Sequence, residues 1–386
     1  MNNLIRHIAL FIRRRSEQKQ VQSVLRQFDE WRLLLEQLPK QNHHQQKLAI
    51  VRLDDIGDYL LWRNFLKVYK ASERFKGYEI TLIGNVVWKS IFEAYDSDAV
   101  DKSIWVDKHQ YFASPDYRMQ LWQVIRNQRF STIVCPSRSR PLLLDDMMLL
   151  AADAPTRIAA HNSFEAGKWN SISDALYNEH FTKATNGHEW HFNRAFAALI
   201  AESNIQIERI FLPVESGRLL KKNQVICFIG AAAKSKTWPL AYWVELVKLL
   251  QQNSYDVLLS GGKNEMPVAD KIVAATEAKS IVGQTNLVET LQAISGAEAI
   301  ITGDTMAAHA AVSFNKPTVI LANGVNAKRF VAYEEAGFEK VKTIYTREYL
   351  NSNKGKFYKA VTKDMESIKP KIILLELNKL IHRQKG

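Results

Sequence analysis

The chain has 386 residues, of which 46% are hydrophobic and 24% charged. This length exceeds one typical domain and fits two, and the composition is that of a globular protein with ample core material. The formal net charge of +12 favours an anionic partner, but it does not distinguish nucleic acid, a phosphorylated substrate and a membrane surface. No apolar stretch reaches the roughly 18 residues of a membrane-spanning helix, so none is expected.

Cysteine and histidine usage argues against disulfides and against a metal centre. The two cysteines, Cys135 and Cys227, lie in apolar, strand-like runs, and we interpret them as buried free thiols of a reducing compartment. No cysteines and histidines have the spacing of metal ligands. The string HEWH at 188–191 lacks the HExxH spacing of a zinc-binding helix, so we interpret it as structural.

The first 46 residues are predicted to form a basic helix followed by a polar linker. Residues 3–38 contain neither Gly nor Pro, and a short apolar stretch near their start precedes RRRSEQK at 13–19. That stretch is interrupted by charge and lacks a small-residue cleavage site, so it is not typical of a signal peptide. Two interpretations remain open: the helix lies on an anionic membrane surface, or it packs on the first domain with its charged face in solvent.

Residues 47–204 alternate between short apolar runs and amphipathic segments. The predicted strands are 48–53, 78–85, 103–107 and 131–137, and the predicted helices are 58–71, 87–95, 117–128 and 188–203. This alternation is typical of a parallel sheet with helices on both faces. We therefore predict a Rossmann-like domain over these residues.

The segment 205–223, punctuated by Pro213 and Gly217, is the predicted connection to a second Rossmann-like domain at 224–386. The predicted strands of that domain are 225–230, 255–261, 297–303 and 317–323, and its predicted helices are 239–252, 267–276, 287–296, 305–314 and 366–381. Pro370 is expected to kink the last helix. The predicted fold class is thus α/β, with two domains that face a central cleft and an extra N-terminal helix.

One strand-to-helix turn of the second domain, GDTMAAH at 303–309, carries candidate binding residues. Such a turn presents backbone N–H groups at a positive helix end, which favours phosphate. The Asp304 carboxylate could cap the helix by accepting its N–H groups, a role that can coexist with one in binding, and Thr305 and Met306 stand at the predicted helix start. His309 would lie near the helix mouth, within reach of a phosphate or ribose, although a lone histidine among alanines is also typical of a packed side chain.

Two further turns of this domain carry candidates of the same kind. GAAAKSKTWP at 230–239 brings Lys234 and Lys236 to the start of a helix, where their ammonium groups would neutralise a departing diphosphate. The alternative is a pair of solvated lysines. In SGGKNE at 260–265 the glycines permit close approach of a ligand, and Glu265 would accept hydrogen bonds from a ribose diol unless it is simply a solvated acid.

The turn DDIGD at 54–58 places Asp58 at the start of a helix facing the predicted cleft. A carboxylate there can take a proton from an attacking hydroxyl. Asp54 and Asp55 are interpreted as loop acids or as ligands of a sugar hydroxyl. The string also matches the DDxxD pattern of metal-dependent prenyl-diphosphate enzymes, but those acids line a helix, whereas here a strand precedes them and Gly57 interrupts.

Other nucleotide-binding patterns are absent from the sequence. No GxGxxG and no GxxxxGK[ST] occurs at a strand-to-helix turn, which argues against dehydrogenases and P-loop proteins. No DxD-like pair follows a strand in a way that would hold a metal on a diphosphate. We therefore expect lysines and helix ends to take that role, with no cofactor.

Three segments in this order resemble glycosyltransferase family 9, the lipopolysaccharide heptosyltransferases: RLDDIGDYLLWRNF, GAAAKSKTWPLAYWVELVKLL and GDTMAAHAAVSFNKP. The resemblance runs from about residue 47 to residue 381 and includes HEWHFNRAFAAL. It implies a GT-B fold, an inverting, metal-independent transfer and typically an ADP-heptose donor. The first domain would bind the acceptor, and the second the nucleotide sugar.

The resemblance also implies roles for single residues. Asp58 takes the place of the catalytic base. Lys236 takes that of the lysine that contacts the donor phosphates, and Glu265 that of the acid that binds the ribose. Asp304 and His309 match the Asp and His of the motif D-[ST]-G-x-x-H.

The chain departs from the family pattern at three positions. Met306 stands where glycine is usual, and Ala232 and Ala233 stand where hydroxyl residues are common. These departures keep a non-catalytic nucleotide-sugar-binding or scaffold protein open as an alternative. A sugar-nucleotide 2-epimerase of the same architecture is another.

The main hypothesis is a cytoplasmic glycosyltransferase, peripheral on the inner face of the bacterial inner membrane. Its expected partners are a nucleotide-sugar donor, an anionic lipid-linked glycan acceptor such as a lipopolysaccharide core, and the membrane surface through the N-terminal helix. Nucleic acid is not expected as a partner, since only the net charge favours it.

Overall fold

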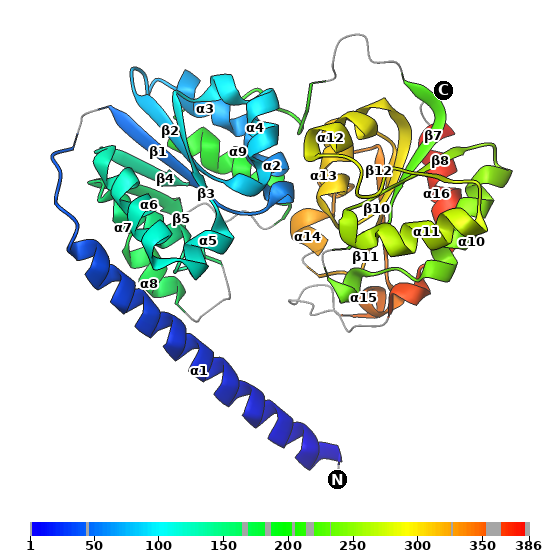
Figure 1. The fold of residues 1–386 in the computed structure, drawn as a ribbon, viewed down its shortest axis with the longest axis horizontal. Coiled ribbons are helices and arrows are strands. Elements are labelled where there is room, and N and C mark those ends of the chain that lie inside the picture. The colour runs from blue at the N-terminus through cyan, green and yellow to red at the C-terminus, as the bar shows by residue number, and fades with distance from the viewer. Residues whose placement is uncertain are drawn as a thin grey trace.

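The computed structural model describes residues 2–43, 46–163, 169–181, 187–202, 205–213, 220–231, 233–325, 327–352 and 364–382, with side chains from residue 18 onward. Within these ranges the chain forms two α/β units that lie side by side, each built on a six-stranded sheet (Figure 1). The predicted α/β class with two Rossmann-like units is therefore confirmed.

The first sheet is parallel throughout, with strand order β3-β2-β1-β4-β5-β6. Its strands are β1 (Lys47–Arg52), β2 (Glu79–Asn85), β3 (Lys102–Val106), β4 (Thr132–Cys135), β5 (Thr156–Ala160) and β6 (Glu179–Phe181). Helices cover both faces, so the central strands are buried on both sides and read as continuous apolar runs.

The second sheet is also parallel, with order β12-β11-β10-β7-β8-β9. Its strands are β7 (Lys221–Phe228), β8 (Asp256–Ser260), β9 (Lys279–Ser280), β10 (Ala297–Gly303), β11 (Thr318–Ala322) and β12 (Val341–Tyr345). Counted within each unit, both sheets have the strand order 3-2-1-4-5-6 of the Rossmann fold.

Most of the α-helices occupy the crossovers between these strands, whereas α1 precedes the first strand, α9 lies between the two units, and α15 and α16 follow the last strand. The first unit carries α1 (Asn2–Glu36), α2 (Ile56–Trp62), α3 (Leu66–Ala71), α4 (Lys89–Tyr95), α5 (Lys108–Ala113), α6 (Pro115–Asn127), α7 (Asp145–Ala152), α8 (Asn170–Ala175) and α9 (Glu189–Ile200). The second carries α10 (Leu240–Gln252), α11 (Met266–Ala275), α12 (Leu287–Gly296), α13 (Met306–Ser313), α14 (Ala327–Phe330), α15 (Arg347–Asn351) and α16 (Pro370–His382).

Several predicted boundaries differ from the structure. The single helix expected over 58–71 is divided into α2, a 3-10 turn at Arg63–Phe65, and α3. Pro370 begins α16 rather than kinking it, because proline is tolerated in the first turn, where its missing N–H has no partner to lose. Strand β7 begins at Lys221, inside the segment expected as the connection, since Lys221 pairs with Ala297 of β10.

The C-terminal end of α1 packs on the first unit. Phe28, Trp31 and Leu35 are buried there, and the guanidinium carbon of Arg118 lies 4.0 Å from the Trp31 ring centre. The N-terminal part of α1 extends beyond the first unit (Figure 1). The interpretation of a helix packed on the first domain therefore holds for this end of α1. Within the described residues, no helix has both the length and the apolar character needed to span a bilayer.

Apolar packing continues from one unit into the other. Tyr59 and Leu60 of α2 belong to the same buried cluster as Ala307 and Ala308 of α13, and these two helices face each other across the interface. The connection is held to the second unit at Leu212, whose N–H donates to the Ser313 carbonyl (3.0 Å). The relative position of the two units is thus set by side-chain packing as well as by the covalent connection.

Three charged residues, here called the interdomain arginine cluster, also join the units: Arg138, Glu189 and Arg329. The Glu189 side chain is fully buried, and its Oε2 lies 2.8 Å from Nε of Arg138 and 2.7 Å from Nε of Arg329. Nη1 of Arg329 also donates to Oγ of Ser139 (2.6 Å). Burial alone would raise the pKa of Glu189, but the two arginines hold it below its usual range, so Glu189 remains ionised.

Replacing Arg329 should weaken the contact between the units. In Arg329→Met, Glu189 keeps Arg138 but loses its partner on the second unit, so we expect the unfolding free energy to fall by about 2–3 kcal/mol. The radius of gyration should rise because the units separate more readily. Chemical denaturation and small-angle X-ray scattering measure the two effects.

Lys328→Met is the matched control, because Lys328 is exposed and next in sequence. A surface change of this kind should stay within about 0.5 kcal/mol of the unchanged chain. Equal effects of the two substitutions would show that the cluster does not hold the units together.

Candidate active site at the domain interface

Two turns that carry predicted site residues lie at the switch points of the two sheets. The turn with Asp58 follows β1, and the turn with Asp304 follows β10. Strand order reverses between β1 and β4 in the first sheet and between β7 and β10 in the second. In open α/β sheets, ligands bind beyond the carboxyl ends of the strands at such switch points.

The turn after β1 is held by a buried arginine. Arg52 is fully buried, and its Nε lies 2.7 Å from Oδ2 of Asp54, while its Nη2 donates to the Asp58 carbonyl (3.4 Å). Ser137 Oγ donates to the same Asp54 oxygen (3.3 Å). Asp55 is exposed and pairs with Lys108 (2.6 Å). Asp54 and Asp55 are therefore both engaged in ion pairs, and Asp54 fixes the shape of the turn.

Asp58 differs from its two neighbours. Its side chain is partly buried, and among the described residues its carboxylate has neither a hydrogen bond nor an ion pair. Burial raises its pKa to about 8, the negative charge of Asp54 adds to this, and Arg52 opposes it. A carboxylate without a partner and with a pKa near neutrality has the properties of a general base.

The turn after β10 pairs an acid with a lysine. Nζ of Lys236 lies 2.6 Å from Oδ2 of Asp304 and also donates to the Asp304 carbonyl (3.5 Å). Asp304 therefore does not cap α13, and of the two roles considered for it the capping role is excluded. Thr305 is the cap, and its Oγ1 accepts from the Ala307 N–H (3.3 Å). A hydroxyl serves as well as a carboxylate in this position, which leaves Asp304 to bind Lys236.

His309 lies at the contact between α13 and α2. It is buried, and its Nδ1 shares a hydrogen bond with the Tyr333 hydroxyl. A Cβ placed on Gly57 would lie 2.7 Å from Cδ2 of His309, so only glycine allows this approach. Burial lowers the pKa of His309 to about 3, and the charge of Lys236 adds to this. The neutral imidazole thus lies against the residue that precedes Asp58.

Glu265 lies over glycines at the ends of β7 and β8. A Cβ on Gly230 would lie 3.0 Å from Cδ of Glu265, and one on Gly262 would lie 3.1 Å from its Oε2. Among the described residues, the Glu265 carboxylate has no hydrogen-bond donor. The small residues leave room for a ligand beside an acid whose oxygens are free to accept.

The remaining predicted donor residues are less enclosed. Lys234 is exposed, and it begins the 3-10 turn Lys234–Lys236. Asn323, at the end of β11, donates to the Ser235 carbonyl (2.9 Å) and fixes that turn. Met306 is partly buried and packs on the apolar cluster shared by the two units. Ala232 lies outside the described residues.

The sequence patterns did not indicate the charged groups that surround Asp58. Glu189 and Arg329 of the interdomain arginine cluster both influence its pKa, as does Arg52. Glu189 belongs to the HEWH string, for which we expected a structural role, and its partner Arg329 lies 140 residues further along. The one signal in the sequence that could have drawn attention to Glu189 is an acidic residue at the start of a helix, in a position that is buried. Within the described residues, no three His, Cys, Asp or Glu side chains are grouped to hold a metal ion.

Comparison with known proteins finds a family model that matches part of the chain. Residues 175–341 match the model of glycosyltransferase family 9 (heptosyltransferase). Lipopolysaccharide heptosyltransferase 2 of Escherichia coli is 26% identical over 158 residues, which are 39% of this chain and 44% of that protein. The chain therefore spans less than half the length of this relative in sequence alignment.

Solved structures extend the likeness of fold to nearly the whole chain. ADP-heptose heptosyltransferase II of E. coli superposes with a TM-score of 0.65 at 19% identity, covering 88% of this chain and 100% of that one. The E. coli heptosyltransferase WaaC, solved with ADP, gives 0.65 at 13% identity and covers 86% and 99%. The predicted GT-B fold is thus confirmed. The resemblance in sequence is confirmed by the match of residues 175–341 to the model of glycosyltransferase family 9.

Proposed function

We propose that this protein is a glycosyltransferase that transfers a sugar from a nucleoside-diphosphate donor to a hydroxyl of a lipid-linked glycan. Four acids lie around the turn after β1, and the contrast among them supports the proposal. Asp54 pairs with Arg52, Asp55 with Lys108 and Glu189 with Arg329, whereas Asp58 has no cation partner among the described residues. The chain thus keeps one carboxylate free to take a proton.

The proposed reaction is an inverting displacement without a metal. Asp58 takes the proton of an acceptor hydroxyl as its oxygen attacks the anomeric carbon of the donor. The bond from that carbon to the diphosphate breaks on the opposite face, and its electron pair leaves with the diphosphate oxygen. Lys236 and the N–H groups at the start of α13 stabilise this charge, while Glu265 accepts hydrogen bonds from the ribose.

The finer identity of the substrates is proposed from the relatives. One is called an ADP-heptose heptosyltransferase and another was solved with ADP. The proposed donor is accordingly ADP-heptose, and the proposed acceptor is a lipopolysaccharide core or another lipid-linked glycan. We also propose that the protein acts on the cytoplasmic face of the inner membrane, held there through the basic part of α1.

Asp58→Asn should abolish the proposed transfer without loss of donor binding. Removing a general base is expected to lower the rate about 10²–10⁴-fold, and the titration of ADP should not change. In the unchanged protein, the rate should rise about tenfold per pH unit up to about pH 8, the pKa of Asp58. The initial rate of ADP release, with ADP-heptose and a core acceptor, measures both effects across pH.

Stability provides the control for folding of this variant. Because the pKa of Asp58 is raised in the folded protein, the native state holds a proton that the unfolded chain releases between about pH 4 and pH 8. Stability therefore falls as pH rises through that window, and Asp58→Asn should be at least as stable at pH 8.

Equal turnover in the two proteins would favour the non-catalytic alternative. ADP release without acceptor would favour an epimerase-like enzyme.

Lys236→Met should weaken ADP binding by about tenfold or more, because a charge-assisted contact to the diphosphate is lost. Lys234→Met is the matched control, since Lys234 is exposed two residues earlier. Calorimetric titration with ADP, UDP, GDP and CDP, without metal, measures the affinities. Preference for another nucleotide would change the proposed donor, and an equal loss in both variants would remove the special role of Lys236.

Deletion of residues 1–20 tests the proposed membrane contact. This cut removes the RRRSEQK segment and leaves Phe28, Trp31 and Leu35 in the core, so the unfolding free energy should stay nearly unchanged. Sedimentation with vesicles of phosphatidylglycerol should fall strongly, since each basic residue near an anionic surface contributes about 1 kcal/mol. Unchanged sedimentation would place the membrane contact elsewhere.

A further inference from the structure

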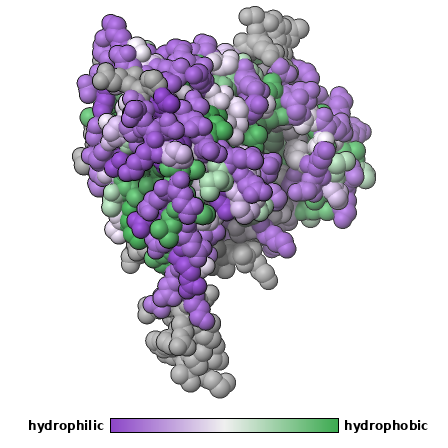
Figure 2. Space-filling model, turned by 60° about the vertical axis from the view of Figure 1, so that its left-hand side comes forward, coloured by the Kyte–Doolittle hydropathy of each residue, from purple (hydrophilic) through white to green (hydrophobic). Residues whose placement is uncertain are grey.

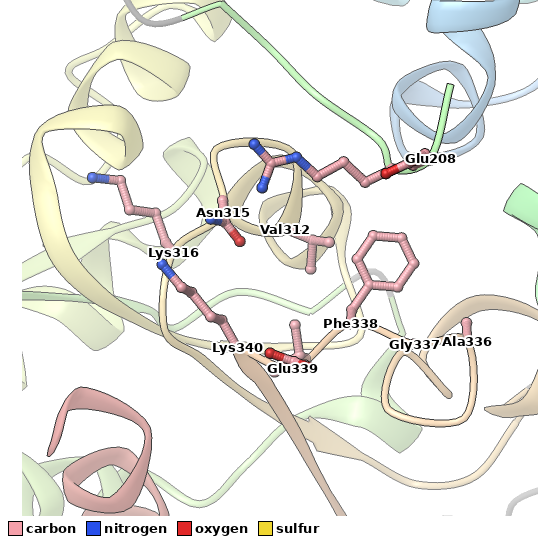
Figure 3. Close-up of a pocket in the computed structure, with 11 residues that line it drawn as sticks. Glu208, Val312, Asn315, Lys316, Ala336, Gly337, Phe338, Glu339 and Lys340 are labelled. Carbon is pink, nitrogen blue, oxygen red and sulfur yellow. The ribbon is translucent and has the colours of Figure 1, made fainter. Parts of the chain in front are cut away.

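A small cavity lies at the edge of the second sheet opposite the candidate active site. It has a volume of about 260 Å³ and is formed by the connection, the end of α13 and the segment that precedes β12 (Figure 3). Its polar side includes Arg209, Asn315, Lys316 and Lys340, and Phe338 closes the other side. The cavity thus combines residues of the connection with residues of the second unit.

Three cations, Arg209, Lys316 and Lys340, surround this cavity. With the amide oxygen of Asn315 turned toward them, Nζ of Lys340 (3.3 Å) and Nη1 of Arg209 (3.2 Å) both donate to that one atom. Lys316 is partly buried, and burial together with the charge of Lys340 lowers its pKa.

Two acids, Glu208 and Glu339, also line the cavity. In the described part of the chain, neither comes within ion-pair distance of Arg209, Lys316 or Lys340. The three cations therefore outnumber the two acids around the cavity, and they repel one another there.

The end of α13 does not account for these cations. A positive side chain at a helix C-terminus is favourable because of the partial negative charge of its free carbonyl groups. Here the last four carbonyls already accept backbone N–H groups, from Phe314, Lys316, Asn315 and Leu212 in turn (3.0, 3.0, 2.9 and 3.0 Å). The ammonium groups of Lys316 and Lys340 are not needed as caps and remain available to a ligand.

We propose that this cavity is a binding site for a phosphate-bearing anion, separate from the donor site. The volume is far above the roughly 30 Å³ of one water and below the range of about 300–1,000 Å³ for drug-sized ligands, which suits a small ion with its hydration water. A phosphate oxygen would replace the Asn315 oxygen as the acceptor shared by Arg209 and Lys340, and Lys316 would bind a second oxygen.

Binding there would connect two parts of the molecule. Arg209 belongs to the connection, and Lys316 and Lys340 belong to the second unit. An anion held by all three would fix the connection to that unit, next to the hydrogen bond between Leu212 and Ser313. The phosphate can come from a soluble compound or from a lipid headgroup, because the recognising chemistry is the same.

Titration of the full chain with inorganic phosphate at low salt, followed by ³¹P NMR, tests the site. We expect binding that is about tenfold weaker in Lys316→Met/Lys340→Met, because two charge-assisted contacts are lost. Lys342→Met is the matched control: Lys342 pairs with Glu334 (2.7 Å), does not line the cavity, and should leave binding unchanged. The same titration in Lys236→Met tests whether phosphate binds at the donor site instead. Phosphate binding in the cavity should persist in that variant.

A second arm separates the two sources of phosphate. The Lys316→Met/Lys340→Met variant and the Lys342→Met control both keep the basic part of α1. Vesicles of phosphatidylglycerol that sediment less of the double variant than of the control would therefore support the site and identify a lipid headgroup as its source. Phosphate binding that is equal in the double variant and the Lys342 control would overturn the proposal. Phosphate binding that disappears in Lys236→Met alone would also overturn the proposal, whatever the outcome of the ADP titrations.

Discussion

The close approach of α2 to α13 at Gly57 and His309 is the constraint on which the arrangement of the candidate site depends. Any side chain at position 57 would collide with the imidazole, and the contact brings the turn after β1 against the helix that follows β10. The imidazole is kept neutral by burial, so no repelling charge forms at this contact. Asp58 therefore lies beside the second unit rather than across an open gap from it.

Charge neutralisation around this contact is uneven. Arg52 and Arg329 neutralise two acids, and Lys236 neutralises Asp304, while Asp58 retains a high pKa. An acid that is left unpaired near other acids lowers the unfolding free energy near neutral pH. The reason is that the folded protein must either keep this acid protonated or tolerate its negative charge. Such a cost is typical of functional sites, and it is the physical basis of the proposal that Asp58, among several neighbouring acids, takes the proton.

Sequence patterns predicted the architecture well where periodicity was strong. The long apolar runs gave β1, β2 and β10 nearly to the residue, whereas β6 and β9, with three and two residues, are too short to stand out from loops. Local patterns located Asp58, Lys236 and Glu265 at turns. They could not show that Asp304 binds Lys236 or that Glu189 meets Arg329, because those pairings arise only from the packing of distant segments.

The attachment of α1 has a mechanical consequence. Phe28, Trp31 and Leu35 belong to a buried cluster whose other members all lie in the first unit. The helix and the first unit therefore move together as one rigid part. A surface that binds the free part of the helix would therefore set the orientation of the first unit. If α1 makes the proposed membrane contact and the second unit holds the proposed donor, the first unit stays fixed at the surface, and exchange of the nucleotide requires movement of the second unit alone.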